Sequence, residues 1–229
     1  MTGIYKTICI DAGHGGTDPG AVNGAAYEKN INLDIALKLK TLFQLDGYRV
    51  FMVRETDVFS KPIDRAKFAN EMKADLYISL HCNSHTQDNA KGTETWYYTG
   101  SKEGQALAES IQHSLVKWLG LTDRGIKHRK DLIVLNATTM PAVLIETAFL
   151  SNPDEKLLLL NNGFKSHVAR AIYDGVRALN GEEVYSVDND IKTAVQREYN
   201  FSDETMDYLV KYRFGKELIE RLYEKIKGA

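Results

Sequence analysis

Hydrophobic and polar residues follow two different patterns along this chain of 229 residues. Short continuous apolar runs have the length and β-branched content of buried strands. Longer stretches carry apolar residues three and four positions apart, which is typical of helices with one buried face. The runs predict strands at residues 8–12, 48–53, 76–81, 92–98, 132–135 and 142–147. The longer stretches predict helices at residues 30–45, 63–72, 104–119 and 162–179.

Repeated alternation of strands and helices predicts an α/β fold, with a mostly parallel sheet flanked by helices on both faces. The strand at 92–98 alternates, with Thr93, Thr95 and Tyr97 on one face, and we expect it at an edge of the sheet. Residues 1–180 are expected to form this domain.

Residues 181–229 lack strand patterns and are charged, tyrosine-rich and helical. We expect a small all-α segment, with a helix at 188–199 and a second that Ser202 caps and that runs through Val210. Gly215 is expected to separate it from a last helical segment. Fewer than about 50 residues rarely fold alone. The apolar stripe should therefore pack on the main domain, on a second copy through self-association, or on an external ligand.

Composition narrows the function classes. The apolar content of 43% and charged content of 26% are typical of a globular protein, and the net charge of −2 argues against nucleic acid as a partner. The basic stretch at 127–130 is expected to be a solvated loop. No apolar run reaches the roughly 18 residues of a membrane span. The first residues lack the pattern of a signal peptide, so we expect synthesis in the cytoplasm, and any outer target would have to be reached by another route.

The two cysteines, Cys9 and Cys82, lie in or beside predicted strands. We expect both to be small buried hydrophobic residues without a disulfide. Cys82 follows His81, which raises the alternative of a nucleophilic dyad. Adjacent side chains of a strand point to opposite faces, and this works against the alternative.

Three of the predicted strands end in residues that can bind a metal or transfer protons: His14, His81 and Glu146. Ligands of open α/β sheets lie beyond the carboxyl ends of the strands. If these strands are parallel neighbours, the three side chains converge. The glycines around His14 do not have the spacing of a nucleotide-binding loop, and no P-loop lysine follows. We expect them to let the backbone turn sharply and to leave room around the imidazole.

Glu28 stands at the start of the first predicted helix, where an acidic residue often only complements the helix dipole. Beside two histidines, however, it would complete a zinc site with three protein ligands. Glu146 ends the most apolar strand, where a carboxylate is costly unless it is paired, ligating or catalytic. Partial burial would raise its pKa and suit a general base. The other histidines are expected to be structural or solvated, with His85 the one substitute ligand: His85, His113, His128 and His167.

Several motifs occur together in one order over residues 5–180. They are Ile10-Asp11-Ala12-Gly13-His14-Gly15-Gly16 with Asp18-Pro19-Gly20-Ala21, Glu28-Lys29, Arg54-Glu55-Thr56-Asp57, Asp64-Arg65 with Ala69-Asn70, Ser79-Leu80-His81-Cys82-Asn83-Ser84, and Pro141 to Glu146 with Phe149-Leu150-Ser151-Asn152. With these motifs the chain resembles the zinc-dependent N-acetylmuramoyl-L-alanine amidases of the Amidase_3 type.

The resemblance implies that His14, Glu28 and His81 hold Zn²⁺ and that Glu146 is the catalytic carboxylate. It implies a six-stranded sheet, and peptidoglycan as the substrate. The bond cut would be the amide between the lactyl group of N-acetylmuramic acid and L-alanine, attacked by zinc-activated water. The missing leader would fit a phage endolysin, which we favour, or a mother-cell enzyme that acts after lysis.

Two departures from the family pattern lead to further expectations. In some family members an extra helix covers the site. The segment at residues 83–92 is short and polar here, so we expect no such helix and an open cleft. Residues 182–229 show no recognisable wall-binding repeat, and we expect them to help bind the wall or to self-associate. Two alternative functions stay open at this point: a zinc peptidase or deacetylase acting on another cell-wall amide, and a non-catalytic wall-binding protein.

Overall fold

The computed structural model of the chain describes residues 5–182, 189–202, 205–206, 209 and 215–228. Contacts between residues divide the chain into two compact units, Met1–Glu182 and Glu183–Ala229. Each unit has buried apolar residues of its own.

The first unit is built on a six-stranded sheet with the order β4-β1-β5-β8-β6-β7. Strands β4, β1, β5 and β8 run parallel, whereas β6 is antiparallel to β8 and parallel to β7. The strands of this sheet are β1 (Thr7–Ala12), β4 (Arg49–Met52), β5 (Leu76–Asn83), β6 (Thr93–Tyr98), β7 (Asp123–Arg129) and β8 (Ala142–Phe149). A small hairpin, β2 (Val22–Asn23) and β3 (Ala26–Tyr27), precedes the first helix.

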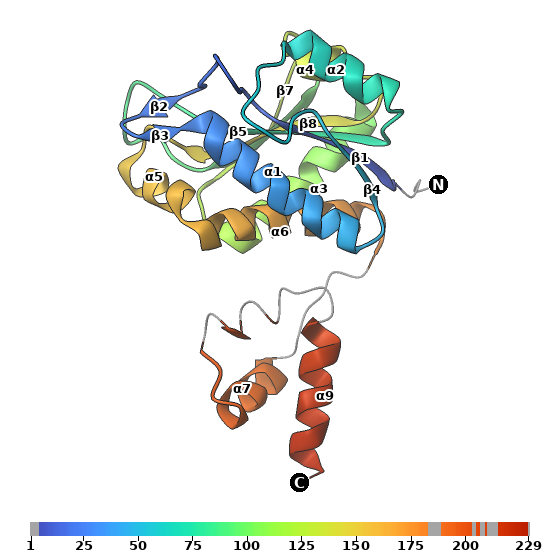
Figure 1. Cartoon of the computed structure of the whole chain (residues 1–229), viewed down its shortest axis with the longest axis vertical. Coiled ribbons are helices and arrows are strands. Elements are labelled where there is room, and N and C mark those ends of the chain that lie inside the picture. Colours follow the sequence, from blue (N-terminus) through green and yellow to red (C-terminus); the bar gives the residue numbers. More distant parts are fainter. Residues whose placement is uncertain (1–4, 183–188, 203–204, 207–208, 210–214, 229) are drawn as a thin grey trace. The chain divides into compact units, whose positions relative to one another are not determined.

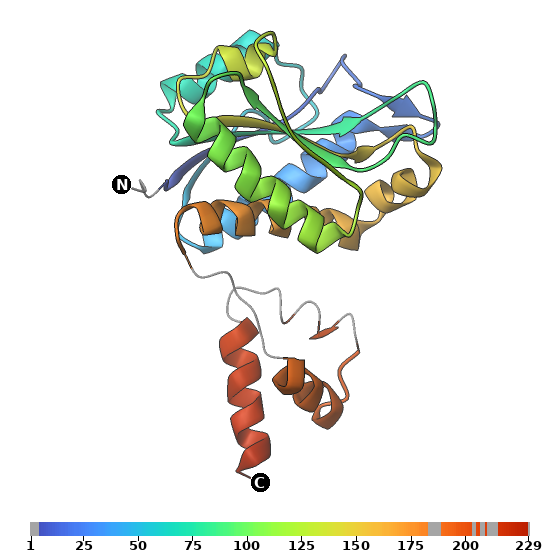
Figure 2. The same ribbon diagram turned by 180° about the vertical axis from the view of Figure 1, so that it is seen from behind.

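Helices cover both faces of the sheet (Figures 1 and 2). On one face lie α1 (Glu28–Leu45), α3 (Lys102–Leu119) and α6 (Asn162–Leu179), with α5 (Pro153–Leu160) packed against α6. On the other face lie α2 (Pro62–Glu71) and α4 (Ile133–Asn136). Along β1, Ile8 and Ile10 join the large core and Cys9 the smaller one. This double burial explains why β1 is a continuous apolar run.

The predicted fold class is confirmed, and the three site-bearing strands are parallel neighbours. Ile10 lies opposite Ile78 of β5, and Ile78 lies opposite Val143 of β8. Thr95 and Tyr97 stand on one face of β6, as expected. Thr95 donates a hydrogen bond to Gln112 of α3, and Tyr97 belongs to the large core. In the part of the chain that the structure describes, no helix is long and apolar enough to cross a membrane.

Three predictions about individual elements were wrong. The strand at 92–98 is β6, and it lies inside the sheet between β8 and β7. The edge strand is β7, which includes Lys127 of the basic stretch expected in a loop; its side chains are half-buried or exposed and leave no apolar signal. Residues 132–135 contribute to the short helix α4 instead of a strand, since four apolar residues fit either period.

Helix α5 has no counterpart among the elements predicted from the sequence. Asn152 caps it by accepting hydrogen bonds from the backbone N–H groups of Asp154 and Glu155, and Pro153 occupies the first turn. This is a strong start signal for a helix, and it was overlooked because the helix is only eight residues long.

In the second unit, α7 (Asn189–Glu198) and α9 (Gly215–Lys227) pack together. Val195, Met206 and Ile219 are fully buried there, so the apolar stripe packs within its own unit. Gly215 is the first residue of α9, the expected last helical segment. Ser202 Oγ accepts a hydrogen bond from Thr205 N as a capping residue would. Asp188 and Val210, at the ends of the two predicted helices, lie outside the described residues.

Candidate active site

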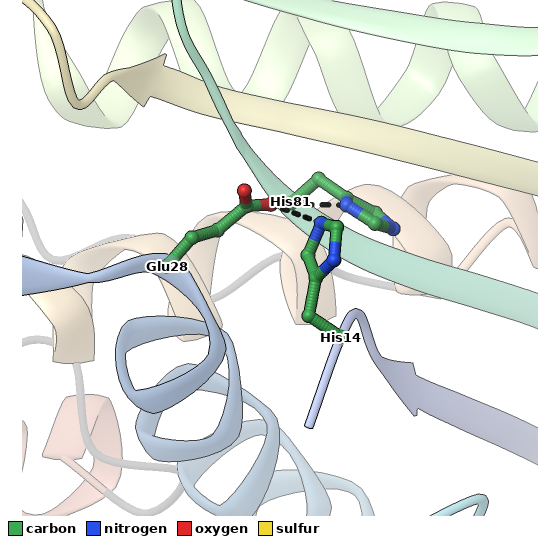
Figure 3. A group of neighbouring side chains, drawn as sticks. All are labelled: His14, Glu28 and His81. Carbon is green, nitrogen blue, oxygen red and sulfur yellow. Dashed lines mark hydrogen bonds and ion pairs between the residues drawn. The ribbon is translucent and has the colours of Figure 1, made fainter. Parts of the chain in front are cut away.

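His14, Glu28 and His81 come together at the carboxyl end of the sheet (Figure 3). His14 follows β1, Glu28 is the first residue of α1, and His81 lies near the end of β5. Their candidate ligand atoms all lie within 4.8 Å of one another. Glu28 Oε1 is 3.1 Å from His14 Nε2 and 3.0 Å from His81 Nδ1. Two ring nitrogens therefore point at one carboxylate oxygen.

Other polar groups hold these side chains in place. Asp18 Oδ2 lies 2.8 Å from His14 Nδ1, which leaves Nε2 of the same ring facing Glu28. Glu28 is buried, and its two oxygens accept hydrogen bonds from the backbone N–H groups of Ala21 and Cys82. A carboxylate behind a histidine is the arrangement that orients metal-binding imidazoles in proteins.

The three side chains strongly shift one another's pKa values. Burial acts to lower the pKa of His14, but hydrogen bonds and charge attraction from Glu28 and Asp18 outweigh it and raise the pKa to about 9. The pKa of His81 is also raised: burial acts to lower it, but the hydrogen bond and the charge of Glu28 outweigh burial. Burial alone would raise the pKa of Glu28, yet the two imidazoles hold it well below its usual range. This arrangement stabilises positive charge between the three side chains.

Two imidazoles and a carboxylate are a donor set that suits zinc and leaves one position for water or substrate. The buried Glu28 carboxylate, the Asp18 contact and the strong preference for positive charge all fit such an ion. The residues present therefore fit the group that the sequence analysis expected.

Glycines make room for the cluster, as the sequence analysis expected. A Cβ atom at Gly13 would overlap the His81 ring, and one at Gly20 would come within 2.6 Å of His14 Cδ2. His14 itself has a φ of 62°, in the left-handed region that few non-glycine residues adopt. The turn after β1 thus places the imidazole at some conformational cost.

Replacing Gly13 by alanine is expected to lower metal affinity by at least about tenfold, the lower end of the effects seen when the support of a ligand is disturbed. The added methyl group would displace the His81 ring, while the backbone at Gly13 needs no left-handed conformation. Zinc titration against a chromophoric chelator measures the affinity. Gly228→Ala is the matched control, since a Cβ there meets only ordinary contacts. Equal affinity in Gly13→Ala and the control would show that the ring has room to move.

Glu146 lies on β8 directly opposite His81, and both side chains stand on the same face of the sheet. It is not part of the three-residue cluster. Its Oε2 atom is buried and has no hydrogen-bond partner among the described residues. Burial raises the pKa of Glu146 to about 7; His81 opposes this shift, and the Glu28 and Glu94 carboxylates add to it. Glu146 thus has an acceptor atom without a hydrogen-bond partner among the described residues and a pKa near neutral pH.

Two buried arginines that the sequence analysis gave no role support the turn at His14. Arg65 Nη2 donates to the His14 carbonyl at 2.8 Å, and Arg65 Nη1 pairs with Asp11 at 2.6 Å. Arg54 donates to the carbonyls of Ala12 and Gly13. Arg65 could have been recognised as a charged residue on the buried side of a helix.

The remaining candidates from the sequence analysis lie outside the cluster. Of the histidines, His85 accepts a hydrogen bond from Gln87 N and His128 contacts Thr99, so His85 does not replace a ligand. His113 and His167 lie on α3 and α6. Both cysteines are free and buried, and burial raises the pKa of Cys82 well above its usual value, which disfavours a nucleophilic thiolate. Residues 84–92, all described, contain turns and bends and no helix.

A histidine–carboxylate–histidine cluster beside an unpaired carboxylate, at the carboxyl end of parallel strands, defines an α/β protein with a candidate hydrolytic metal centre. Comparison with known families agrees with this class. Residues 8–178 match the Amidase_3 family, described as N-acetylmuramoyl-L-alanine amidase, and the chain belongs to this family.

Relatives and solved structures support the assignment. The chain is 37% identical over 174 residues to N-acetylmuramoyl-L-alanine amidase LytC of Bacillus subtilis, covering 75% of this chain and 35% of LytC. It is 39% identical over 181 residues to the endolysin of Bacillus phage SPP1, covering 76% of this chain and 65% of the endolysin. The catalytic domain of the amidase CwlV from Bacillus (Paenibacillus) polymyxa superposes with a TM-score of 0.74 at 36% identity, covering 78% of this chain and 99% of that domain. The chain thus spans about a third to two thirds of the length of these two curated relatives.

Proposed function

We propose that the protein is a zinc-dependent amidase. Its reaction is hydrolysis of the peptidoglycan amide between the lactyl group of N-acetylmuramic acid and L-alanine of the stem peptide. The observation that carries this proposal is the pairing of the His14–Glu28–His81 cluster with the unpartnered Oε2 of Glu146 on the neighbouring strand. Family membership and relatives named as N-acetylmuramoyl-L-alanine amidases support this bond over another cell-wall amide and over binding without catalysis.

In this proposal His14, Glu28 and His81 hold the zinc ion, which supplies Lewis acidity to the scissile carbonyl and to water when bound. Asp18 keeps the His14 ring in the orientation that presents Nε2. Glu146 accepts a proton from the attacking water as the new C–O bond forms. Its protonated carboxyl then returns the proton to the alanine nitrogen as the C–N bond breaks. A pKa of about 7 lets one side chain perform both transfers.

Lysis of purified cell walls tests the proposal directly. We expect the turbidity of a wall suspension to fall on addition of the protein, to stay constant when a chelator removes the metal, and to fall again after zinc is restored. Each turnover should release one new L-alanine amino end and leave muramic acid intact. New amino ends on other residues, or free acetate, would instead indicate a peptidase or a deacetylase. Undiminished lysis in a metal-free protein would contradict the role of the cluster.

A further inference from the structure

The catalytic face of the sheet continues from Glu146 into a group of basic side chains on the edge strand. Glu94 of β6 lies directly opposite Glu146 in the antiparallel pair, so both side chains stand on the same face. β7 follows β6 as the last strand of the sheet. Two of its residues, Arg124 and Lys127, point their charged ends at Glu94.

Glu94 is 2% exposed, and its oxygens have four donors from side chains. Arg124 Nε lies 2.6 Å and Lys127 Nζ 2.5 Å from the same oxygen, Oε2. Asn83 Nδ2 and Trp96 Nε1 donate to Oε1 at 3.2 Å and 3.0 Å. Two cations share one buried carboxylate, so the group carries an excess positive charge.

The two cations have both rigidity and access to solvent. The side chain of Arg124 is 34% exposed and that of Lys127 32% exposed. Arg124 lies over the Phe149 ring and Lys127 over the Trp96 ring, at 4.8 Å and 5.3 Å from the ring centres. Such contacts limit the motion of the charged ends while leaving N–H groups free to bind an anion.

Spacing connects this group to the reaction. Neighbouring strands lie about 4.8 Å apart, so β7 is roughly 10 Å from β8 and Glu146. An extended peptide rises about 3.3 Å per residue. If the peptide runs from the scissile amide across the ends of β6 and β7, its first two or three residues lie over Arg124 and Lys127.

We propose that Arg124 and Lys127 form a subsite for a carboxylate on the second residue of the stem peptide, counted from L-alanine. The inference rests on the proposed function and adds a substrate preference to it. Glu94 is a positioning residue, because its buried carboxylate holds the two cations toward the catalytic face. The enzyme therefore prefers an acidic second residue over its neutral amide.

Two soluble muramyl peptides test this preference. They differ only in the second residue, which bears a carboxylate in one and a carboxamide in the other. We expect kcat/KM for release of the L-alanine amine to be about fivefold higher for the carboxylate peptide, the upper end of the scale for a partly exposed ion pair. Lys127→Met and Arg124→Met should each bring the ratio toward one. Raising the salt concentration should also reduce it, because salt screens exposed charges.

Lys130→Met is the matched control, an exposed lysine just beyond the end of β7, and it should keep the full preference. Lys127→Arg should keep it too, which separates loss of charge from damage to the strand. Equal kcat/KM for the two peptides in the wild-type protein, or an unchanged ratio in Lys127→Met, would overturn the subsite and leave the proposed function intact. No release of the amine from either peptide would overturn both.

Discussion

Replacing Glu146 by glutamine is expected to lower kcat by about 10²- to 10⁴-fold, the usual contribution of a general acid–base residue. A glutamine amide keeps the size of the side chain but cannot accept the proton of the attacking water. Zinc content should stay at the wild-type level, because Glu146 does not belong to the candidate ligand cluster of His14, Glu28 and His81. Metal analysis and hydrolysis of a soluble muramyl peptide, measured on the same preparation, check both halves of this result.

Two companion variants make the test specific. Glu71→Gln, at the exposed end of α2, removes a carboxylate far from the site and should leave turnover and metal content unchanged. His81→Ala should instead lose metal, because it removes one of the three candidate ligand atoms. Near-normal hydrolysis by zinc-loaded Glu146→Gln would sink the assignment of Glu146 as the base.

The same variant has an expected effect on stability. Burial raises the pKa of Glu146 to about 7 from an ordinary 4.5, so the folded protein binds this proton more tightly than the unfolded chain. The contribution of Glu146 to stability is therefore fully present below pH 4.5 and is lost as pH rises to about 7. In metal-free protein at pH 8, Glu146→Gln should raise the free energy of unfolding by about 2 kcal/mol, with little change near pH 4. Urea unfolding in the presence of a chelator measures both values.

Replacing Arg65 by methionine is expected to lower the free energy of unfolding by about 3–5 kcal/mol, the cost of breaking a buried ion pair at one partner. Asp11 is fully buried, and without Arg65 its side-chain donors among the described residues are the hydroxyl groups of Tyr77 and Ser79. The carbonyl of His14 would lose its bond to Arg65 as well. Metal affinity should therefore fall together with stability, whereas a purely structural residue would affect stability alone. Urea unfolding and zinc titration measure the two effects.

Arg129→Met supplies the comparison for this result. Arg129 pairs with Asp131 on the surface, and the loss of an exposed pair is expected to leave the free energy of unfolding almost unchanged. If Arg65→Met were as stable as Arg129→Met, the buried pair would have no role in holding the turn. If it were unstable but bound zinc normally, the turn at His14 would not depend on Arg65.

Sequence patterns predicted those helices and strands whose buried residues leave a clear apolar pattern, either a continuous run or a helical spacing. The runs around Ile10, Ile78 and Val143 are apolar on both faces, and all three form central parallel strands. β7 was missed because an edge strand with half-exposed side chains has no such run. The four apolar residues at 132–135 were assigned to a strand, although only packing against the sheet decides between strand and helix.

The role of the second unit stays a prediction. Val195, Met206 and Ile219 form a small core there, so its apolar residues do not all need an external partner. Binding to the cell wall and self-association both remain expectations from the sequence.

The sequence by itself determined which residues stand at the ends of the strands, because apolar runs followed by glycine or polar residues mark those ends. Together with the family motifs, this was enough to name His14, Glu28, His81 and Glu146. Only the tertiary structure decided how they are arranged: strand order brings β1, β5 and β8 together, and the turn at His14 brings its imidazole to Glu28. It also decided that Arg65 supports this turn and that Arg124 and Lys127 extend the catalytic face. These contacts join residues that are far apart in the chain, so the pattern of neighbouring residues cannot predict them.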